Sequence, residues 1–209
     1  DLTLHQTNVD WKGFPWQRAI VHFTRLLGSV HTSDLPSAKA ELNQIKTIHD
    51  TLLQQKDLYK AAQVQIQLTT SNAWILHKEG KSNEALVLMY AAADMEDKTE
   101  KHAVTPGEVL PARELLGDML LQLNKPGEAL KAYEAVLKKQ PARFNGLYGA
   151  GLAAQKVNDL TKAGHYFRLL TEGASSTEAS RPELQAAKLF LQNHSSPSNK
   201  EEVSAKPAD

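Results

Sequence analysis

Residues 110–177 of this chain contain one 34-residue unit written twice. The residues that coincide after a shift of 34 are Gly117 with Gly151, Leu120 with Ala154, Asn124 with Asn158, Ala129 with Ala163, Tyr133 with Phe167, and Val136 with Leu170. A period of 34 that carries a small residue and then Ala-x-x-x-aromatic predicts a stack of helix–turn–helix units. One such unit cannot bury its apolar face alone, so neighbouring units must pack on one another and together present a surface.

The composition excludes several classes of function. Hydrophobic residues make up 41% of the 209 residues, enough for a packed core. The 24 Lys and Arg balance the 24 Asp and Glu, which disfavours nucleic acid as a partner because phosphate binding needs an excess of positive charge. No apolar run approaches the ~20 residues of a membrane-spanning helix. The absence of cysteine excludes disulfides and thiolate chemistry.

The sequence leaves the cellular compartment open. No stretch has the pattern of a signal peptide, and the chain begins at Asp1. We therefore expect either a cytoplasmic protein or an exported one whose signal has been removed. Whether the chain belongs to a longer protein is also open at this stage.

Apolar residues recur at helical spacing through most of the chain. The segments that this pattern predicts are an irregular N-terminus (1–13), helical hairpins at about 14–54, 57–97, 110–140 and 142–173, a capping helix (181–193), and a disordered tail (194–209). The turn inside each hairpin is expected at Ser33, Gly80, Asn124 and Asn158, which lie five residues before a marker alanine. Three of these four are Gly or Asn, the residues that best tolerate a left-handed backbone.

The doubled unit resembles the tetratricopeptide repeat. The matching positions are Arg113, Leu116, Gly117, Leu120, Ala129, Tyr133 and Pro141 in the first copy, and Leu147, Ala150, Gly151, Ala154, Ala163 and Phe167 in the second. Ser175 replaces the final proline, and weaker copies lie around Ala38 and Ala85. The resemblance implies an all-α fold, a right-handed α–α superhelix of about four hairpins with a C-terminal capping helix. Residues 89–124 also resemble the C-terminal part of larger bacterial proteins of this family, which implies no activity.

The resemblance further implies that the first helix of each hairpin lines a concave groove. The groove residues expected from the repeat register are Thr70, Trp74, His77, Lys78, Glu114, Asp118, Leu121, Gln122, Asn145, Tyr148, Leu152 and Gln155. Trp74 and Tyr148 are the expected aromatic anchors for a peptide, although Trp74 serves helix packing equally well. Because Glu114 and Asp118 would repel a carboxylate, we expect a neutral or basic peptide.

One acidic run is the best local candidate for a metal site. It consists of Asp94, Glu96, Asp97 and Glu100, followed by His102. The favoured interpretation is a solvated helix end in which Lys98 and Lys101 pair with Asp94 and Asp97, because an oxygen cage needs more ordered ligands. No cofactor or metal is therefore predicted.

These observations predict a non-enzymatic protein–protein interaction module that binds a peptide or protein segment. The alternative is a structural segment of a larger protein whose functional site lies upstream. That alternative rests on the first helix, whose Trp16, Ile20, Phe23, Leu27 and Val30 spread over more than one face, as if upstream repeats or a second chain packed there. Metal-dependent hydrolysis at 94–102 is the least favoured hypothesis.

Overall fold

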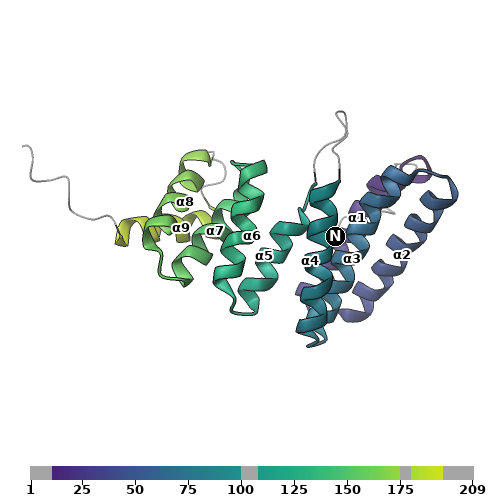
Figure 1. Cartoon of the computed structure of the whole chain (residues 1–209), viewed down its shortest axis with the longest axis horizontal. Coiled ribbons are helices and arrows are strands. Elements are labelled where there is room, and N and C mark those ends of the chain that lie inside the picture. Colours follow the sequence, from purple (N-terminus) through teal and green to yellow (C-terminus); the bar gives the residue numbers. More distant parts are fainter. Residues whose placement is uncertain (1–10, 100–107, 175–179, 195–209) are drawn as a thin grey trace, which may run out of the picture. The chain divides into compact units, whose positions relative to one another are not determined.

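The computed structural model describes residues 11–99, 108–174 and 180–194, and every regular element within these ranges is helical (Figure 1). A short 3₁₀ turn, Trp11–Gly13, precedes α1 (Pro15–His31), α2 (Leu35–Gln54), α3 (Leu58–Lys78), α4 (Ser82–Lys98), α5 (Ala112–Gln122), α6 (Pro126–Lys139), α7 (Phe144–Lys156), α8 (Leu160–Gly173) and α9 (Pro182–Asn193). The predicted all-α class is confirmed for this part of the chain. Most of the predicted irregular start, and the tail after His194, lie outside the described residues.

Five turns between consecutive helices share one feature of the backbone. In each, a single residue with positive φ follows the helix: Ser33 (66°), Lys56 (59°), Gly80 (83°), Asn124 (55°) and Asn158 (61°). In four of these turns the next N–H returns to a carbonyl five residues earlier, as in Asp34 to Ser29 (2.8 Å). This is the Schellman arrangement, which satisfies the last carbonyls of a helix. The four predicted turn positions are confirmed, and Lys56 is an addition.

An aspartate starts the next helix after three of these turns. Asp34, Asp57 and Asp159 each accept a hydrogen bond from the backbone N–H three residues on, at 3.1, 3.2 and 3.0 Å. A side-chain oxygen at this position satisfies an N–H that has no partner within the helix. A left-handed residue followed by an aspartate cap therefore reverses the chain in about two residues, which produces antiparallel neighbours.

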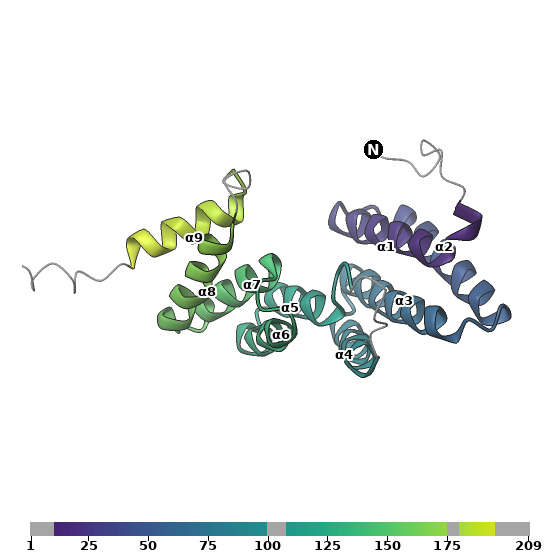
Figure 2. The ribbon, with the colours of Figure 1, turned by 90° about the horizontal axis from the view of Figure 1, so that it is seen from above.

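The described residues group into two compact units, Asp1–Asn124 (unit 1) and Lys125–Asp209 (unit 2). In unit 1, α1 packs against both α2 and α3, α2 also contacts α3, and α4 packs on α3 and α5 (Figure 2). In unit 2, α6 packs on α7, α7 on α8, and α9 covers α8 and touches α7. The boundary falls between α5 and α6, inside the predicted hairpin at 110–140. That hairpin, and one continuous repeat domain over 14–193, stay predictions.

The spread of apolar residues over more than one face of α1 is explained by packing within unit 1. Phe23, Leu27 and Val30 are 4, 5 and 2% exposed, while Trp16 and Ile20 are half-buried. A helix that packs against two neighbours needs apolar residues on two faces, and α1 contacts both α2 and α3. The width of this surface therefore no longer indicates missing upstream repeats or a second chain.

Two glycines of α7 allow close approach of large rings in unit 2. A Cβ atom at Gly149 would lie 2.3 Å from Tyr133 Cζ of α6, and one at Gly151 would lie 2.4 Å from Phe167 Cε1 of α8. Both rings are 1% exposed, and Phe190 of α9 packs 5.0 Å from the Phe167 ring. Gly149 and Gly151 therefore let α7 pack closely against α6 and α8.

Candidate functional site

Three of the residues predicted to line the concave groove are buried. Thr70, Trp74 and Glu114 are each 1% exposed, so they offer no surface to a partner. The Trp74 ring lies 5.3 Å from that of His31 on α1 and 5.9 Å from that of His77. Because α1 packs directly on this face of α3, the indole fills the helix interface. The packing interpretation of Trp74 holds, and its proposed role as an exposed anchor was wrong.

The remaining predicted groove residues fall into two groups. In unit 1, His77 Nε2 and Gln122 Oε1 lie 3.0 Å apart and join α3 to α5, while Lys78 is exposed and Asp118 and Leu121 are partly buried. In unit 2, Asn145 and Gln155 are exposed and Leu152 is half-buried. The Tyr148 ring lies 6.2 Å from that of Phe167, and burial, together with the charge of Glu183, raises the pKa of Tyr148. A peptide-binding role for these residues stays a prediction.

An open groove of about 680 Å³ lies elsewhere on unit 1, between α2, α3 and α4. We call it the amide groove, after the three carboxamide side chains in its lining. Those carboxamides are Asn43, Gln65 and Asn72, and the lining also includes Leu42, Leu76, Leu88, Thr69, Ile75, Lys39 and Glu79. At 3.6 residues per turn, Asn72 lies on the opposite face of α3 from Trp74. The repeat register placed the groove on the Trp74 face of α3, so the sequence did not indicate a groove on the opposite face.

The carboxamides of the amide groove keep hydrogen-bonding capacity for a ligand. Asn72 Nδ2 donates to the Leu68 carbonyl (2.9 Å), which leaves Asn72 Oδ1 as an acceptor, and Gln65 Nε2 donates to Thr69 Oγ1 (3.2 Å). Within the described ranges, the Asn43 carboxamide has no hydrogen-bond partner, and it is exposed. A carboxamide can both donate and accept, so these groups suit a polar chain with alternating donors and acceptors.

Charged residues close one end of the amide groove. The Glu79 carboxylate pairs with Lys39 Nζ at 2.7 Å and Lys81 Nζ at 3.2 Å. Hydrogen bonds from these two lysines lower the pKa of Glu79, so it is ionised at neutral pH. Two cations and one anion leave this end with a small positive charge.

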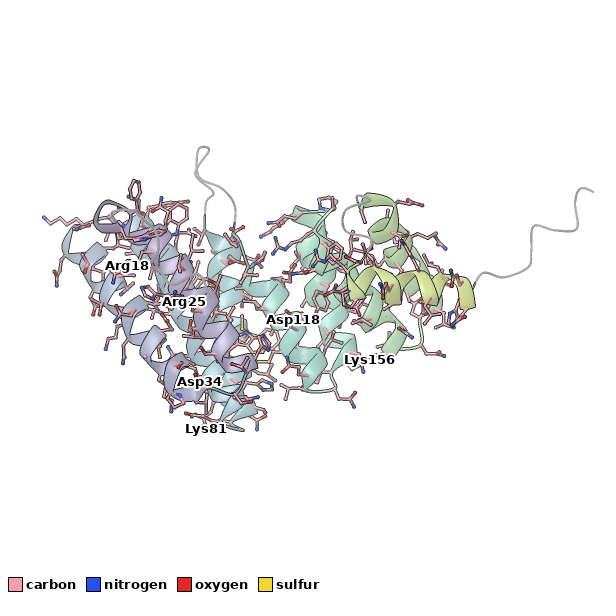
Figure 3. The ribbon with its side chains drawn as sticks, turned by 180° about the vertical axis from the view of Figure 1, so that it is seen from behind. Arg18, Arg25, Asp34, Lys81, Asp118 and Lys156 are labelled. Carbon is pink, nitrogen blue, oxygen red and sulfur yellow. The ribbon has the colours of Figure 1, made fainter. Side chains whose placement is uncertain are left out.

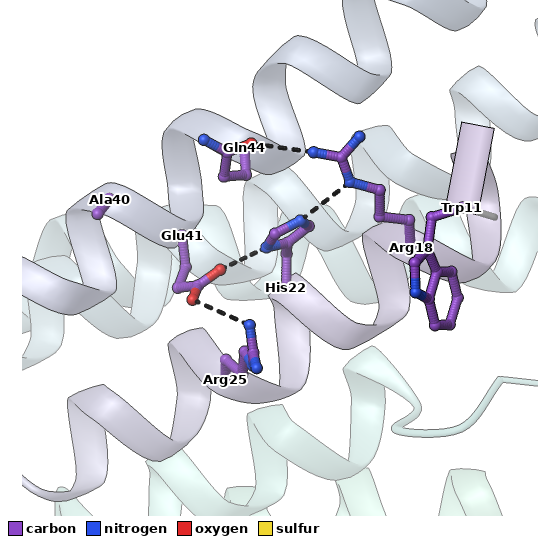
Figure 4. Close-up of a pocket in the computed structure, with 7 residues that line it drawn as sticks. All are labelled: Trp11, Arg18, His22, Arg25, Ala40, Glu41 and Gln44. Carbon is purple, nitrogen blue, oxygen red and sulfur yellow. Dashed lines mark hydrogen bonds and ion pairs between the residues drawn. The ribbon is translucent and has the colours of Figure 1, made fainter. Parts of the chain in front are cut away.

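A second cavity, of about 430 Å³, lies between α1 and α2 in unit 1 (Figure 4). His22, whose side chain is 7% exposed, donates from Nδ1 to Glu41 Oε2 at 2.5 Å. Arg18 donates from Nε to His22 Nε2 (3.4 Å) and from a terminal nitrogen to Gln44 Oε1 (3.3 Å). Arg25 lies 3.9 Å from Glu41 Oε1. Arg18 and Arg25 are two turns apart on the same helix (Figure 3).

The imidazole of this cavity is neutral. Burial lowers the pKa of His22, and this outweighs the hydrogen bond to Glu41, which acts in the opposite direction. A carboxylate can only accept, so the ring proton lies on Nδ1 and Nε2 is free to accept from Arg18. The sequence signal for this cluster is the spacing of Arg18, His22 and Arg25 at i, i+4 and i+7, which places the three side chains on one face of α1.

The acidic run at 94–97 joins α4 to α5. Arg113 of α5 pairs with Asp94 at 2.8 Å and with Asp97 at 2.5 Å. Glu96 accepts the Ala112 backbone N–H at 2.7 Å, so its carboxyl caps the start of α5. The predicted Asp94–Lys98 pair is corrected, because Asp94 pairs with Arg113, while the predicted Asp97–Lys101 pair involves a residue outside the described ranges and stays a prediction. Glu100, Lys101 and His102 lie outside the described residues.

Glu96 is the most perturbed carboxyl of the described residues. Burial, reinforced by the charge of Glu108, raises its pKa to about 8. Among the described residues, no group of three or more His, Asp or Glu side chains is placed to hold a metal ion. The run therefore acts as a connection between helices in this structure.

No helix within the described ranges is both long and apolar enough to cross a bilayer. Searches of protein-family models, curated proteins and solved structures find no match to this chain.

Proposed function

We propose that this chain is a non-enzymatic protein-interaction module, a right-handed superhelix of tetratricopeptide-like hairpins, and that it binds an extended peptide in the amide groove. The observation that carries the proposal is the lining of that groove, in which carboxamides from α2 and α3 stand beside leucines from α2, α3 and α4. The recurrent left-handed turn after α1, α3, α5 and α7 supports the repeat architecture.

An extended peptide fits this lining for a physical reason. Its backbone presents N–H and C=O groups in alternation, and its side chains point in opposite directions at successive residues. Asn43 and Asn72 can pair with either kind of backbone group without regard to charge. Leu42, Leu76 and Leu88 offer apolar contact to the side chains that face the groove.

The chemistry of the lining favours binding over catalysis. Carboxamides neither take up nor release a proton at neutral pH, so they cannot act as a general acid or base. The charged end of the groove is largely compensated through the contacts of Glu79 with Lys39 and Lys81. We therefore expect a neutral peptide with apolar side chains, in place of the neutral or basic one inferred from Glu114 and Asp118.

Selection from a displayed library of 12-residue peptides tests the proposal. The full chain should select peptides that bind with micromolar affinity. The double variant Asn43→Leu/Asn72→Leu should weaken that binding by roughly tenfold or more, because each lost hydrogen bond contributes about 0.5–1.5 kcal/mol.

The matched control is Asn145→Leu/Gln155→Leu, which replaces two exposed carboxamides of unit 2 in the same way. It should keep the parent affinity. Equal binding by the parent and the Asn43/Asn72 variant, or loss of binding only in the unit 2 variant, would contradict the assignment to the amide groove.

A further inference from the structure

The cavity between α1 and α2 has the size of a small-molecule site and is open on one side. Its volume of about 430 Å³ lies within the usual range for ligand pockets. Arg18, His22 and Arg25 come from α1, Glu41 and Gln44 from α2, and Trp11 from the preceding 3₁₀ turn stands at one end (Figure 4).

Arg18 has no counter-ion among the residues of this cavity that the structure describes. It is half-buried, and the described residues place no carboxylate within 4.0 Å of its guanidinium. Its hydrogen bonds to His22 and Gln44 are long, at 3.4 and 3.3 Å, and both acceptors are neutral. A guanidinium has five N–H donors in a planar fork, so most of its capacity to bind an anion is unused.

The described lining favours a ligand with one negative charge. Arg18 is a cation that no described carboxylate pairs with, and Glu41 is an anion in the same lining. Glu41 would repel a phosphate dianion more strongly than a monoanion, so a carboxylate is favoured.

The surrounding groups are already positioned. His22 is held by the 2.5 Å contact with Glu41, and Gln44 holds the far side of Arg18. The indole of Trp11 adds an aromatic wall to one end of the cavity. A planar carboxylate matches the planar guanidinium fork, and an aromatic body suits the indole.

We propose that this cavity binds a small aromatic monocarboxylate, with Arg18 as the residue that pairs with the carboxylate and Trp11 as the surface that contacts the ring. The assignment is independent of peptide binding in the amide groove.

Titration of the full chain with benzoate, followed by calorimetry and by ligand-observed NMR, tests the proposal. Benzoate should bind saturably with a dissociation constant of roughly 1 mM, as expected for a ligand of this size. Benzamide, which has the same shape without the charge, and inorganic phosphate should bind at least tenfold more weakly. Arg18→Gln should weaken benzoate binding at least tenfold, whereas Arg168→Gln, at an exposed arginine of α8, should leave it unchanged.

A variant that is expected to strengthen benzoate binding distinguishes an effect on affinity from misfolding. Glu41→Gln removes the competing negative charge and keeps an acceptor for His22, so it should strengthen benzoate binding several-fold. Asn72→Leu should have no effect, which distinguishes this site from the amide groove. Circular dichroism confirms that each variant remains folded.

Three results would overturn the proposal. These are equal binding of benzoate and benzamide, no benzoate binding up to ~10 mM, and unchanged binding in Arg18→Gln. A capped tripeptide with a central glutamate tests the other source of a carboxylate. If it binds more tightly than benzoate and depends on Arg18, the aromatic ligand is overturned as well, because the site then takes an acidic side chain of a protein and not a free small molecule.

Discussion

The double variant Gly149→Ala/Gly151→Ala is expected to destabilise unit 2 by up to about 4 kcal/mol. Each new Cβ would enter the volume of a buried ring, at 2.3 Å from Tyr133 Cζ and 2.4 Å from Phe167 Cε1. Neither ring can swing into solvent without losing its burial, since both are 1% exposed. Overpacking of this kind typically costs 1–3 kcal/mol per site, and the higher helix propensity of alanine offsets about 1 kcal/mol of each cost.

Gly164→Ala is the matched control for this effect. Gly164 lies in the middle of α8, and a Cβ there would meet only Arg168 Nη1 at 3.6 Å, an ordinary contact. The gain in helix propensity should therefore leave the protein as stable as the parent, or more stable by up to ~1 kcal/mol. Thermal and urea denaturation followed by circular dichroism measures both changes. If alanines at 149 and 151 stabilise the protein as the one at 164 does, the close approach of the rings to α7 is wrong.

Unit 1 should lose stability as the pH rises from about 5 to 8. The pKa of Glu96 is raised from 4.5 to about 8 in the folded chain, mainly by burial, so between these values the folded state holds a proton that the unfolded state has released. Stability falls with pH wherever the folded state binds more protons. Allowing for partial solvent access to this carboxyl, we expect a loss of roughly 2–4 kcal/mol across this range.

Glu96→Gln mimics the protonated carboxyl and should remove this dependence of stability on pH. Its Oε1 can still accept the Ala112 N–H, so the variant should match the parent near pH 5 and exceed it by roughly 2–4 kcal/mol near pH 9. All three tryptophans lie in unit 1, so tryptophan fluorescence during urea denaturation reports on this unit. The lowered pKa of His22 reduces stability only as the pH falls below about 6.5, so the range above it isolates Glu96.

Glu84→Gln serves as the control, because Glu84 is an exposed carboxylate at the start of the same helix. Its stability should depend on pH in the same way as that of the parent. A parent whose stability does not change between pH 6.5 and 8.5, or a slope that survives in Glu96→Gln, would show that the Glu96 carboxyl is ionised in the folded chain.

The helices and turns were predictable because their signals are local. A left-handed residue after a helix favours Gly or Asn, and Gly80, Asn124 and Asn158 follow that preference. Lys56 adopts the same conformation although lysine does not favour it, so the residue type did not predict a turn at this position. Here the aspartate that follows, Asp57, caps the next helix and helps to fix the turn.

The candidate site was less predictable because it depends on which helices meet. The family register placed Trp74 on an exposed face, whereas α1 covers that face and the amide groove lies on the opposite side of α3. The contacts of Asp94 and Asp97 with Arg113 were also missed, because Arg113 follows these aspartates by 19 and 16 residues and no rule for neighbouring positions on a helix selects it. Contacts between distant segments require the packing of the helices, which periodicity alone does not specify.

Chemical-shift mapping with a peptide from the displayed library tests the central claim, that the amide groove is the binding surface. Backbone and side-chain NH₂ signals of the isotope-labelled full chain would be followed as unlabelled peptide is added. The account predicts the largest shifts at Asn43, Gln65 and Asn72 and along α2, α3 and α4, with unchanged signals in α7. Shifts confined to His77, Gln122 and their neighbours, or to Asn145 and Gln155 in unit 2, would contradict it.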